Sequence, residues 1–146
     1  MLAAVRSQSV FERRAEAIRR AYAAFSRRDL DGALELLAPD VEWPDVLGGT
    51  TVHGRDAVRR YWEEQQFGIE SRVEPMSFVE AGDSVAVRVR QHVRALPDGD
   101  EEELTVVHLL AFEGEGEGDG DGDGDRVTAM RVYYSLDEAL DAAAAS

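Results

Sequence analysis

The spacing of apolar residues changes once along the chain, and this change is the strongest constraint on its fold. Up to about residue 68, apolar side chains recur at steps of three and four, which is the period of a helix. The first such row is Phe11, Ala15, Ile18, Tyr22 and Phe25. Beyond that point apolar and polar residues alternate, which is the period of a strand. Helices followed by a run of strands predict an α+β fold.

The first half predicts three helices and one short strand. Ser9 and Glu12 have the spacing of a capping box, and Asp29 can cap a second helix that ends before Pro39. Gly48-Gly49 is typical of a turn. The helices are expected at 10–27, from 29 to before Pro39, and at 55–66, with the strand at 41–43.

The second half predicts four strands and a terminal helix. The strands are expected at 69–81, 84–95, 102–112 and 126–134, joined in sequence as hairpins. Ser135 and Glu138 form a second capping box, which opens a helix through about Ala143. We therefore expect a curved antiparallel sheet with the N-terminal helices packed over its concave face. Such a cone-shaped cup encloses a space of ligand size.

Length and charge narrow the function classes. A chain of 146 residues fits one domain, 1–146, and the absence of cysteine excludes thiolate chemistry. The net charge of −14 argues against a nucleic-acid partner, because phosphate contacts need a cationic surface. No apolar run is long enough to span a membrane, and no signal peptide is recognisable. We expect a cytoplasmic protein without a membrane partner.

An acidic, glycine-rich tract supplies half of the net charge. Seven acids alternate with six glycines between Glu113 and Asp125. Asp119, Asp121 and Asp123 match the first half of a calcium-binding loop, but its twelfth position is Met130 rather than the required glutamate. We therefore predict no metal site, and interpret 113–125 as a flexible hairpin loop. Residues 1–8 are expected to be disordered.

Polar residues inside apolar rows mark candidate site positions. Gln91 is the only polar member of the row that holds Val85, Val87, Val89 and Val93. His108 is likewise the only polar member of the row that holds Leu104, Val106, Leu110 and Phe112. If both rows face the helices, Gln91 and His108 point into the enclosed space, where a buried polar group needs a partner. That partner is either a structural hydrogen bond or a ligand.

Asp45 and several aromatic residues complete the candidate site. Asp45 lies just after the short strand that holds Trp43, and near an indole its carboxylate could act as a general base. An exposed turn aspartate is the alternative. Tyr22, Trp43, Trp62 and Tyr134 are the aromatic residues expected to line the walls.

These segments resemble the SnoaL-like and ketosteroid-isomerase-like proteins of the nuclear transport factor 2-like superfamily. The resemblance rests on AYAAFSRRDLDG (21–32), LLAPDVEW (36–43), HGRDAVRRYW (53–62), HLLAF (108–112) and DRVTAMRVYY (125–134). It covers nearly the whole chain and implies the cone-shaped fold. Because this fold hosts isomerases, cyclases, hydrolases, dehydratases and binding proteins, the resemblance leaves the function open.

Carried over residue by residue, the resemblance argues against a steroid isomerase. Trp43 stands where those enzymes carry their aspartate base, and Ala21 stands at the place of their oxyanion tyrosine. Tyr22 is one residue away, which turns it by about 100° around a helix. His108 falls where their neutral carboxylic acid donor sits, so this polar position is retained.

Two functions remain open. In the first, the protein is an enzyme of polyketide-cyclase or isomerase type that acts on a small apolar carbonyl compound. Asp45 would remove a proton, and His108, assisted by Gln91, would donate a hydrogen bond to the enolate oxygen. In the second, it is a non-catalytic module that binds a small apolar molecule. An epoxide-hydrolase-like site ranks below both, because the strand arginines lie on the wrong face.

No cofactor is expected, because no glycine-rich phosphate loop follows a strand. Arg88, Arg90, His92 and Arg94 share the outer face of the sheet, and acids such as Glu101 and Glu103 on the next strand could pair with them. Relatives of this kind often dimerise through that face, so the resemblance implies a homodimer.

Overall fold

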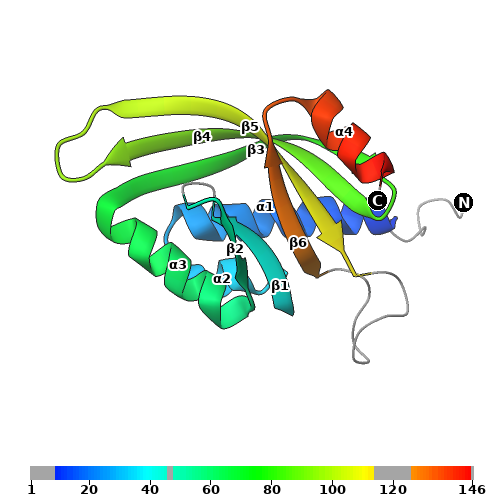
Figure 1. Cartoon of the computed structure of the whole chain (residues 1–146), viewed down its shortest axis with the longest axis horizontal. Helices are drawn as coiled ribbons and strands as arrows, with labels where there is room; N and C mark the ends of the chain where they lie inside the picture. Colours follow the sequence, from blue (N-terminus) through cyan, green and yellow to red (C-terminus); the bar gives the residue numbers. More distant parts are fainter. Residues whose placement is uncertain (1–8, 46–47, 114–125, 146) are drawn as a thin grey trace, which may run out of the picture.

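The fold is a six-stranded, open, curved sheet with helices on both faces (Figure 1). It is seen in a computed structural model, which describes residues 9–45, 48–113 and 126–145. The strand order is β2-β1-β6-β5-β4-β3. The elements are α1 (Val10–Ser26), α2 (Leu30–Leu34), β1 (Leu37–Asp45), β2 (Thr50–His53), α3 (Arg55–Gly68), β3 (Ile69–Ala81), β4 (Ser84–Ala95), β5 (Glu101–Phe112), β6 (Val127–Tyr133) and α4 (Leu136–Ala144). This arrangement confirms the predicted α+β fold, with α1 to α3 over one face.

Helix starts follow the predicted caps. Ser9 Oγ accepts a hydrogen bond from the Glu12 amide at 3.1 Å, and Glu12 Oε1 accepts one from the Ser9 amide at 3.0 Å. Asp29 caps α2 through the Gly32 amide at 3.0 Å, and Ser135 caps α4 through the Glu138 amide at 3.2 Å. Each cap satisfies amides that would otherwise lack a partner in the first turn.

Strands β3 to β6 form the predicted antiparallel meander. Gly82, with φ +65°, sits in the tight turn between β3 and β4. In the register, His108 of β5 lies between Val87 of β4 and Val132 of β6. The strand side chains therefore fall on the two faces as their alternation predicts.

Strand β1 departs from the expectation of a wholly antiparallel sheet. It pairs antiparallel with β2, which the sequence did not reveal, and parallel with β6, so the sheet is mixed. It is also longer than predicted and contains both Pro39 and Pro44. Pro39 is tolerated because the β1–β6 ladder is interrupted between Leu37 and Glu42, where a missing amide costs no ladder bond.

Arg14 of α1 is a buried charged residue, with 5% of its surface exposed. Its guanidinium donates to the carbonyl oxygens of Asp83 at 3.3 Å and Glu113 at 3.2 Å, and lies 4.7 Å from the Phe112 ring centroid. Arg14 therefore ties α1 to the β3–β4 turn and to the end of β5.

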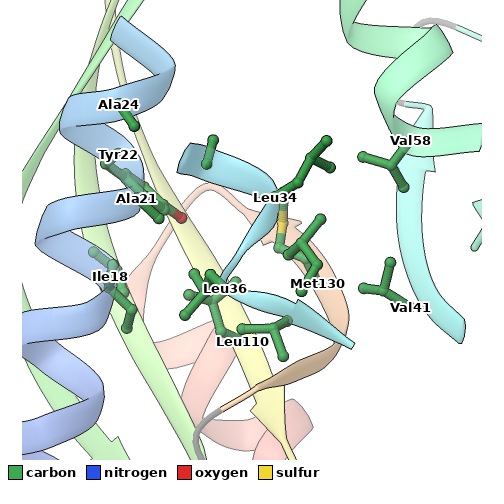
Figure 2. Packing of buried hydrophobic residues seen from close by; sticks show 14 of the residues in the cluster. Ile18, Ala21, Tyr22, Ala24, Leu34, Leu36, Val41, Val58, Leu110 and Met130 are labelled. Carbon is green, nitrogen blue, oxygen red and sulfur yellow. The ribbon is translucent and has the colours of Figure 1, made fainter. Parts of the chain in front are cut away.

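Two hydrophobic clusters divide the faces of the sheet. The larger one packs α1, α2 and α3 against the face that carries Val87 and Leu110. Figure 2 shows part of this cluster, with Ile18 and Tyr22 projecting from α1 toward Leu36 and Leu110. The smaller one seats Ala139 of α4 on the opposite face, against Ala86 and Val107.

The outer face of β3 to β5 carries paired charges, as predicted. Arg90 contacts Glu103 at 3.2 Å and Glu74 at 3.6 Å, and Arg94 contacts Glu70 at 2.7 Å. Strand β3 is an edge of the sheet, and its ladder with β4 is broken by a bulge between Pro75 and Ser77. The opposite edge is the four-residue strand β2.

Two predictions fall on parts of the chain outside the described residues, namely the disorder of 1–8 and all but Glu113 of the flexible acidic loop. Within the described ranges, no helix combines the length and apolar character that crossing a bilayer requires.

Candidate functional site

A cavity of about 330 Å³ lies between the helices and the concave face of the sheet. This volume is at the small end of the range for ligand pockets. Every helix of the concave side and most strands contribute to its wall. The lining residues are Ala21, Tyr22, Phe25, Ala33, Leu36, Leu37, Trp43, Pro44, Tyr61, Trp62, Gln65, Ile69, Ser71, Val73, Gln91, Val93, Leu104, Val106, His108, Met130, Val132 and Tyr134.

The wall of this cavity carries no formally charged side chain among the residues that the structure describes. No aspartate, glutamate, lysine or arginine is part of it, although charged residues make up 32% of the chain. A charged ligand buried here would lose its hydration without gaining a counter-ion. The wall of the main cavity therefore disfavours a charged group of a ligand.

His108 and Tyr22 form a hydrogen-bonded pair, the Tyr22–His108 pair, in the buried part of the wall. The Tyr22 hydroxyl lies 2.7 Å from Nδ1 of His108, and the two rings are tilted by 57° with centroids 5.7 Å apart. Tyr22 comes from α1 and His108 from β5, 86 positions later. The described residues offer no hydrogen-bond partner to Nε2 of His108, so this nitrogen can bind a ligand.

Burial keeps both members of the pair neutral. Desolvation lowers the pKa of His108 from 6.5 to about 4, because the protonated ring would lose its hydration. The same cause raises the pKa of the Tyr22 hydroxyl well above its usual range. At neutral pH the pair therefore consists of an imidazole and a phenol, each with one exchangeable proton.

The tautomer of His108 determines which atom of the pair can donate a hydrogen bond to a ligand. If the Tyr22 hydroxyl donates to Nδ1, then Nε2 of His108 carries the ring proton and can donate to a ligand. If Nδ1 donates to the Tyr22 oxygen, the Tyr22 hydroxyl can donate instead, and Nε2 becomes an acceptor. In both states the pair retains one donor for a ligand oxygen.

An aromatic wall stands on the side of α3. Trp62 packs edge to face against Phe25, with centroids 5.2 Å apart, and against Trp43, with centroids 5.3 Å apart. Edge-to-face packing holds these rings in fixed positions. The structure thus places four sequence-predicted residues, Tyr22, Trp43, Trp62 and His108, around one cavity.

Gln91 and Tyr134 also line the cavity, but they are less buried than the Tyr22–His108 pair. Gln91 Nε2 donates to Ser71 Oγ at 3.4 Å, a long hydrogen bond between two half-buried side chains. Tyr134 is 76% exposed and Leu104 is 46% exposed. The cavity therefore opens near Leu104 and Tyr134, while the Tyr22–His108 pair lies at its buried end.

Asp45 is the sequence-predicted residue that does not join this group. It is absent from the cavity wall, and its Oδ1 accepts a hydrogen bond from the Gly48 amide at 2.8 Å. The Gly49 amide donates to the Asp45 carbonyl oxygen, also at 2.8 Å. The Asp45 carboxylate and carbonyl thus accept hydrogen bonds from the local backbone at Gly48 and Gly49. The Asp45 base stays a prediction without a geometric link to the cavity.

The site predicted from the sequence did not include three polar residues of the wall, Tyr61, Gln65 and Ser71. Gln65 Nε2 donates to the Tyr61 hydroxyl at 3.0 Å, one helical turn apart on α3. The helical period itself could have found this pair, because residues four apart share a face. Ser71 could have been found from the β3–β4 register, which sets it opposite Val93 and next to Gln91.

A curved open sheet with helices on its concave face and an apolar cavity between them defines the class of nuclear transport factor 2-like pocket proteins. Within this class, the chain belongs to the SnoaL-like domain family, whose model matches residues 18–117. No curated protein matches the sequence.

Solved structures have the same fold. An NTF2-like protein of unknown function from Burkholderia pseudomallei K96243 is 31% identical, with a TM-score of 0.68 over 88% of this chain and 95% of that one. TerC, co-crystallised with polyporic acid, is 27% identical, with a TM-score of 0.67 over 88% and 98%. SalBIII is an epoxide hydrolase/cyclase-like enzyme with a role in pyran ring formation in the polyether salinomycin. It is 19% identical to this chain, with a TM-score of 0.68 over 86% of this chain and 93% of that one.

Among the described side chains, no group of three or more His, Asp or Glu residues is arranged to hold a metal ion. The candidate site therefore consists of an apolar cavity, the neutral Tyr22–His108 pair, and further polar side chains of the wall at Tyr61, Gln65, Ser71 and Gln91.

Proposed function

We propose that this protein binds a small, neutral, largely apolar molecule with a carbonyl or hydroxyl oxygen. The observation that carries the proposal is the Tyr22–His108 pair, with its 2.7 Å hydrogen bond, in a wall without charged side chains. The apolar wall favours the body of the ligand, and the donor retained by the pair binds its oxygen. The co-crystallisation of TerC with polyporic acid supports a small organic ligand for this type of cavity.

The two tryptophans of the chain make this proposal easy to test. Both Trp43 and Trp62 line the cavity, so intrinsic fluorescence reports directly on its occupancy. We expect titration with 2-decalone, a bicyclic neutral ketone, to change the emission with saturation. His108→Phe should weaken binding about tenfold, the value of one buried hydrogen bond of roughly 1.4 kcal/mol.

A matched pair of controls separates the oxygen contact from simple loss of volume. Decalin, which has the same body without the carbonyl, should bind wild type and His108→Phe alike. Asp45→Asn should bind 2-decalone as wild type does, because Asp45 lies outside the cavity wall. If neither 2-decalone nor decalin binds the wild type with saturation, the proposed ligand class is refuted.

We also propose, as a second function, that the Tyr22–His108 pair moves protons on a carbonyl compound. The supporting observation is that the two groups share one short hydrogen bond and so can exchange their donor and acceptor roles. A ligand C–H proton next to the carbonyl passes to Nε2 of His108. The Nδ1 proton passes to the Tyr22 oxygen, and the Tyr22 hydroxyl proton passes to the carbonyl oxygen. The C–H electron pair becomes the C=C bond of an enol, and no net charge develops on the protein.

Isotope exchange distinguishes this chemistry from binding alone. In D2O, an enzyme of this kind should accelerate deuterium incorporation next to the carbonyl of 2-decalone, measured by NMR. Tyr22→Phe breaks the relay and should reduce the rate to that of the unassisted reaction. Asp45→Asn tests the earlier expectation of a carboxylate base. If bound 2-decalone exchanges no faster than free 2-decalone, the protein is a binding module.

A further inference from the structure

A second, smaller cavity of about 40 Å³ lies directly behind the wall of the main one. The two cavities share six lining residues, Phe25, Gln65, Ile69, Ser71, Gln91 and Val93. Three of these six are uncharged polar side chains, in a molecule whose main cavity is mostly apolar. The smaller cavity exceeds the space needed for one water, so a narrow chain of atoms fits it.

The smaller cavity differs from the main one in charge. Its two additional lining residues are Arg28 and Gln66, and Arg28 is the only charged residue of either wall within the described ranges. Arg28 is exposed, and it lines the smaller cavity but not the main one. A molecule that spans both cavities would meet apolar surface first, then amides and a hydroxyl, and finally a guanidinium.

The backbone at Arg28 is unusual for this residue type. Arg28 has φ +66° and is the only described non-glycine residue with positive φ. The conformation follows from the end of α1, where the Arg28 amide donates to the Phe25 carbonyl at 3.0 Å and the Asp29 amide to that of Ala24 at 2.8 Å. Glycine is the residue that adopts this conformation without steric cost. An arginine here is a conformational outlier of the kind that often accompanies function.

The guanidinium of Arg28 is available for an anion. None of the described carboxylates forms a salt bridge with it, whereas the neighbouring Arg27 pairs with Asp29 at 3.4 Å. Arg94 chiefly, and Arg28 in smaller part, lower the pKa of the Glu70 carboxyl. Glu70 itself is held by Arg94 at 2.7 Å.

We propose that Arg28 and the smaller cavity form a subsite for an acidic arm of the ligand. This inference rests on the proposed function, because the neutral body of the ligand occupies the main cavity. The arm passes between Gln65, Ser71 and Gln91, and the long hydrogen bond from Gln91 to Ser71 can be exchanged for contacts with it. Its carboxylate pairs with the guanidinium of Arg28. The preferred ligand class is therefore an apolar ketone or alcohol that carries a carboxylate on a flexible chain.

The test compares acids with uncharged twins of the same shape. The probes are 2-decalones with ω-carboxyalkyl chains of increasing length, each paired with its primary amide, and binding is measured by calorimetry. At one chain length the acid should bind wild type at least tenfold more tightly than its amide. A general preference for anions is not expected from a protein of net charge −14. Arg28→Gln should abolish the acid's advantage and leave 2-decalone binding unchanged.

Arg27→Gln is the matched control, because Arg27 is the adjacent arginine and lines neither cavity. It should retain the full difference between acid and amide. Equal binding of acid and amide to the wild type at every chain length, with 2-decalone still bound, would overturn the subsite alone. Loss of the acid's advantage in Arg27→Gln as well as in Arg28→Gln would overturn the assignment to Arg28. Failure of every probe to bind would overturn both the subsite and the proposed function.

Discussion

At the scale of single residues, the burial of His108 has a measurable consequence for stability. The pKa is about 4 in the folded chain and 6.5 in the unfolded one, so between these values only the unfolded chain binds the proton. The stabilising contribution is therefore complete above about pH 6.5 and disappears as the pH falls to about 4. Its size is up to about 3 kcal/mol.

Urea unfolding of wild type and His108→Gln at pH 7 and pH 4.5 measures this contribution. Acid effects of other groups, such as the loss of the Glu70 ion pair, are common to both proteins and cancel in the comparison. The wild type should lose about 2–3 kcal/mol more than His108→Gln, which has no ring to protonate. Equal losses would show that His108 titrates normally in the folded protein.

Arg28 supplies a second prediction at this scale. A left-handed conformation costs a residue with a side chain roughly 1–2 kcal/mol, and glycine avoids this cost. Part of the gain is lost, because glycine also gives the unfolded chain more conformational entropy. Arg28→Gly should therefore raise the free energy of unfolding by about 0.5–1 kcal/mol and the Tm by a few degrees. Arg27→Gly, at φ −96°, should lower the Tm. The opposite order would mean that the Arg28 side chain stabilises the fold by other contacts.

The residues also show what could be predicted from the sequence at a site. His108 and Gln91 were predictable, because strand alternation alone puts them on the apolar face. The hydrogen bond between Tyr22 and His108 was not, because it depends on how α1 lies across β5. The position of the Asp45 side chain depends on a competition between the strand direction and local hydrogen bonds to the Gly48 and Gly49 amides. Spacing along the chain carries no information on which of the two wins.

At the scale of elements, Arg14 links three parts of the fold. Its two carbonyl acceptors belong to the β3–β4 turn and to the end of β5. Arg14→Met should lower the free energy of unfolding by about 2–3 kcal/mol, because charged hydrogen bonds are lost and the carbonyls lose partners. Arg20→Met, on the exposed side of the same helix, should cost less than about 0.5 kcal/mol. Chemical denaturation of the two variants gives the comparison.

Most elements were predictable because their signals are local. Capping boxes, alternation and turn glycines lie within a few residues of one another, and α1, β3 and β4 follow them closely. Strand β1 shows the limit of this reasoning. Its prolines argue for a short strand, but an interrupted ladder with β6 accommodates Pro39. That ladder joins residues about 90 positions apart along the chain, beyond the reach of any local pattern.

At the scale of the whole molecule, the homodimer stays a prediction. α4 covers part of the outer sheet face, and the paired charges of Arg90 and Arg94 lie on the same face. We expect light scattering to give a dimer at micromolar concentration, and Arg90→Glu to shift it toward monomer by placing like charges beside Glu74 and Glu103. A wild-type monomer at tens of micromolar would refute this expectation.

The broken edge of β3 has a consequence for the molecule in a crowded solution. A long, regular edge strand exposes a row of amides and carbonyls on which further chains can add to a growing aggregate. In β3, Pro75 removes one of these amides and the adjoining bulge breaks the regular row. The four-residue strand β2 is too short to be a good template at the other edge. Pro75→Val, which restores a β-former, should therefore shorten the lag before turbidity appears on gentle heating.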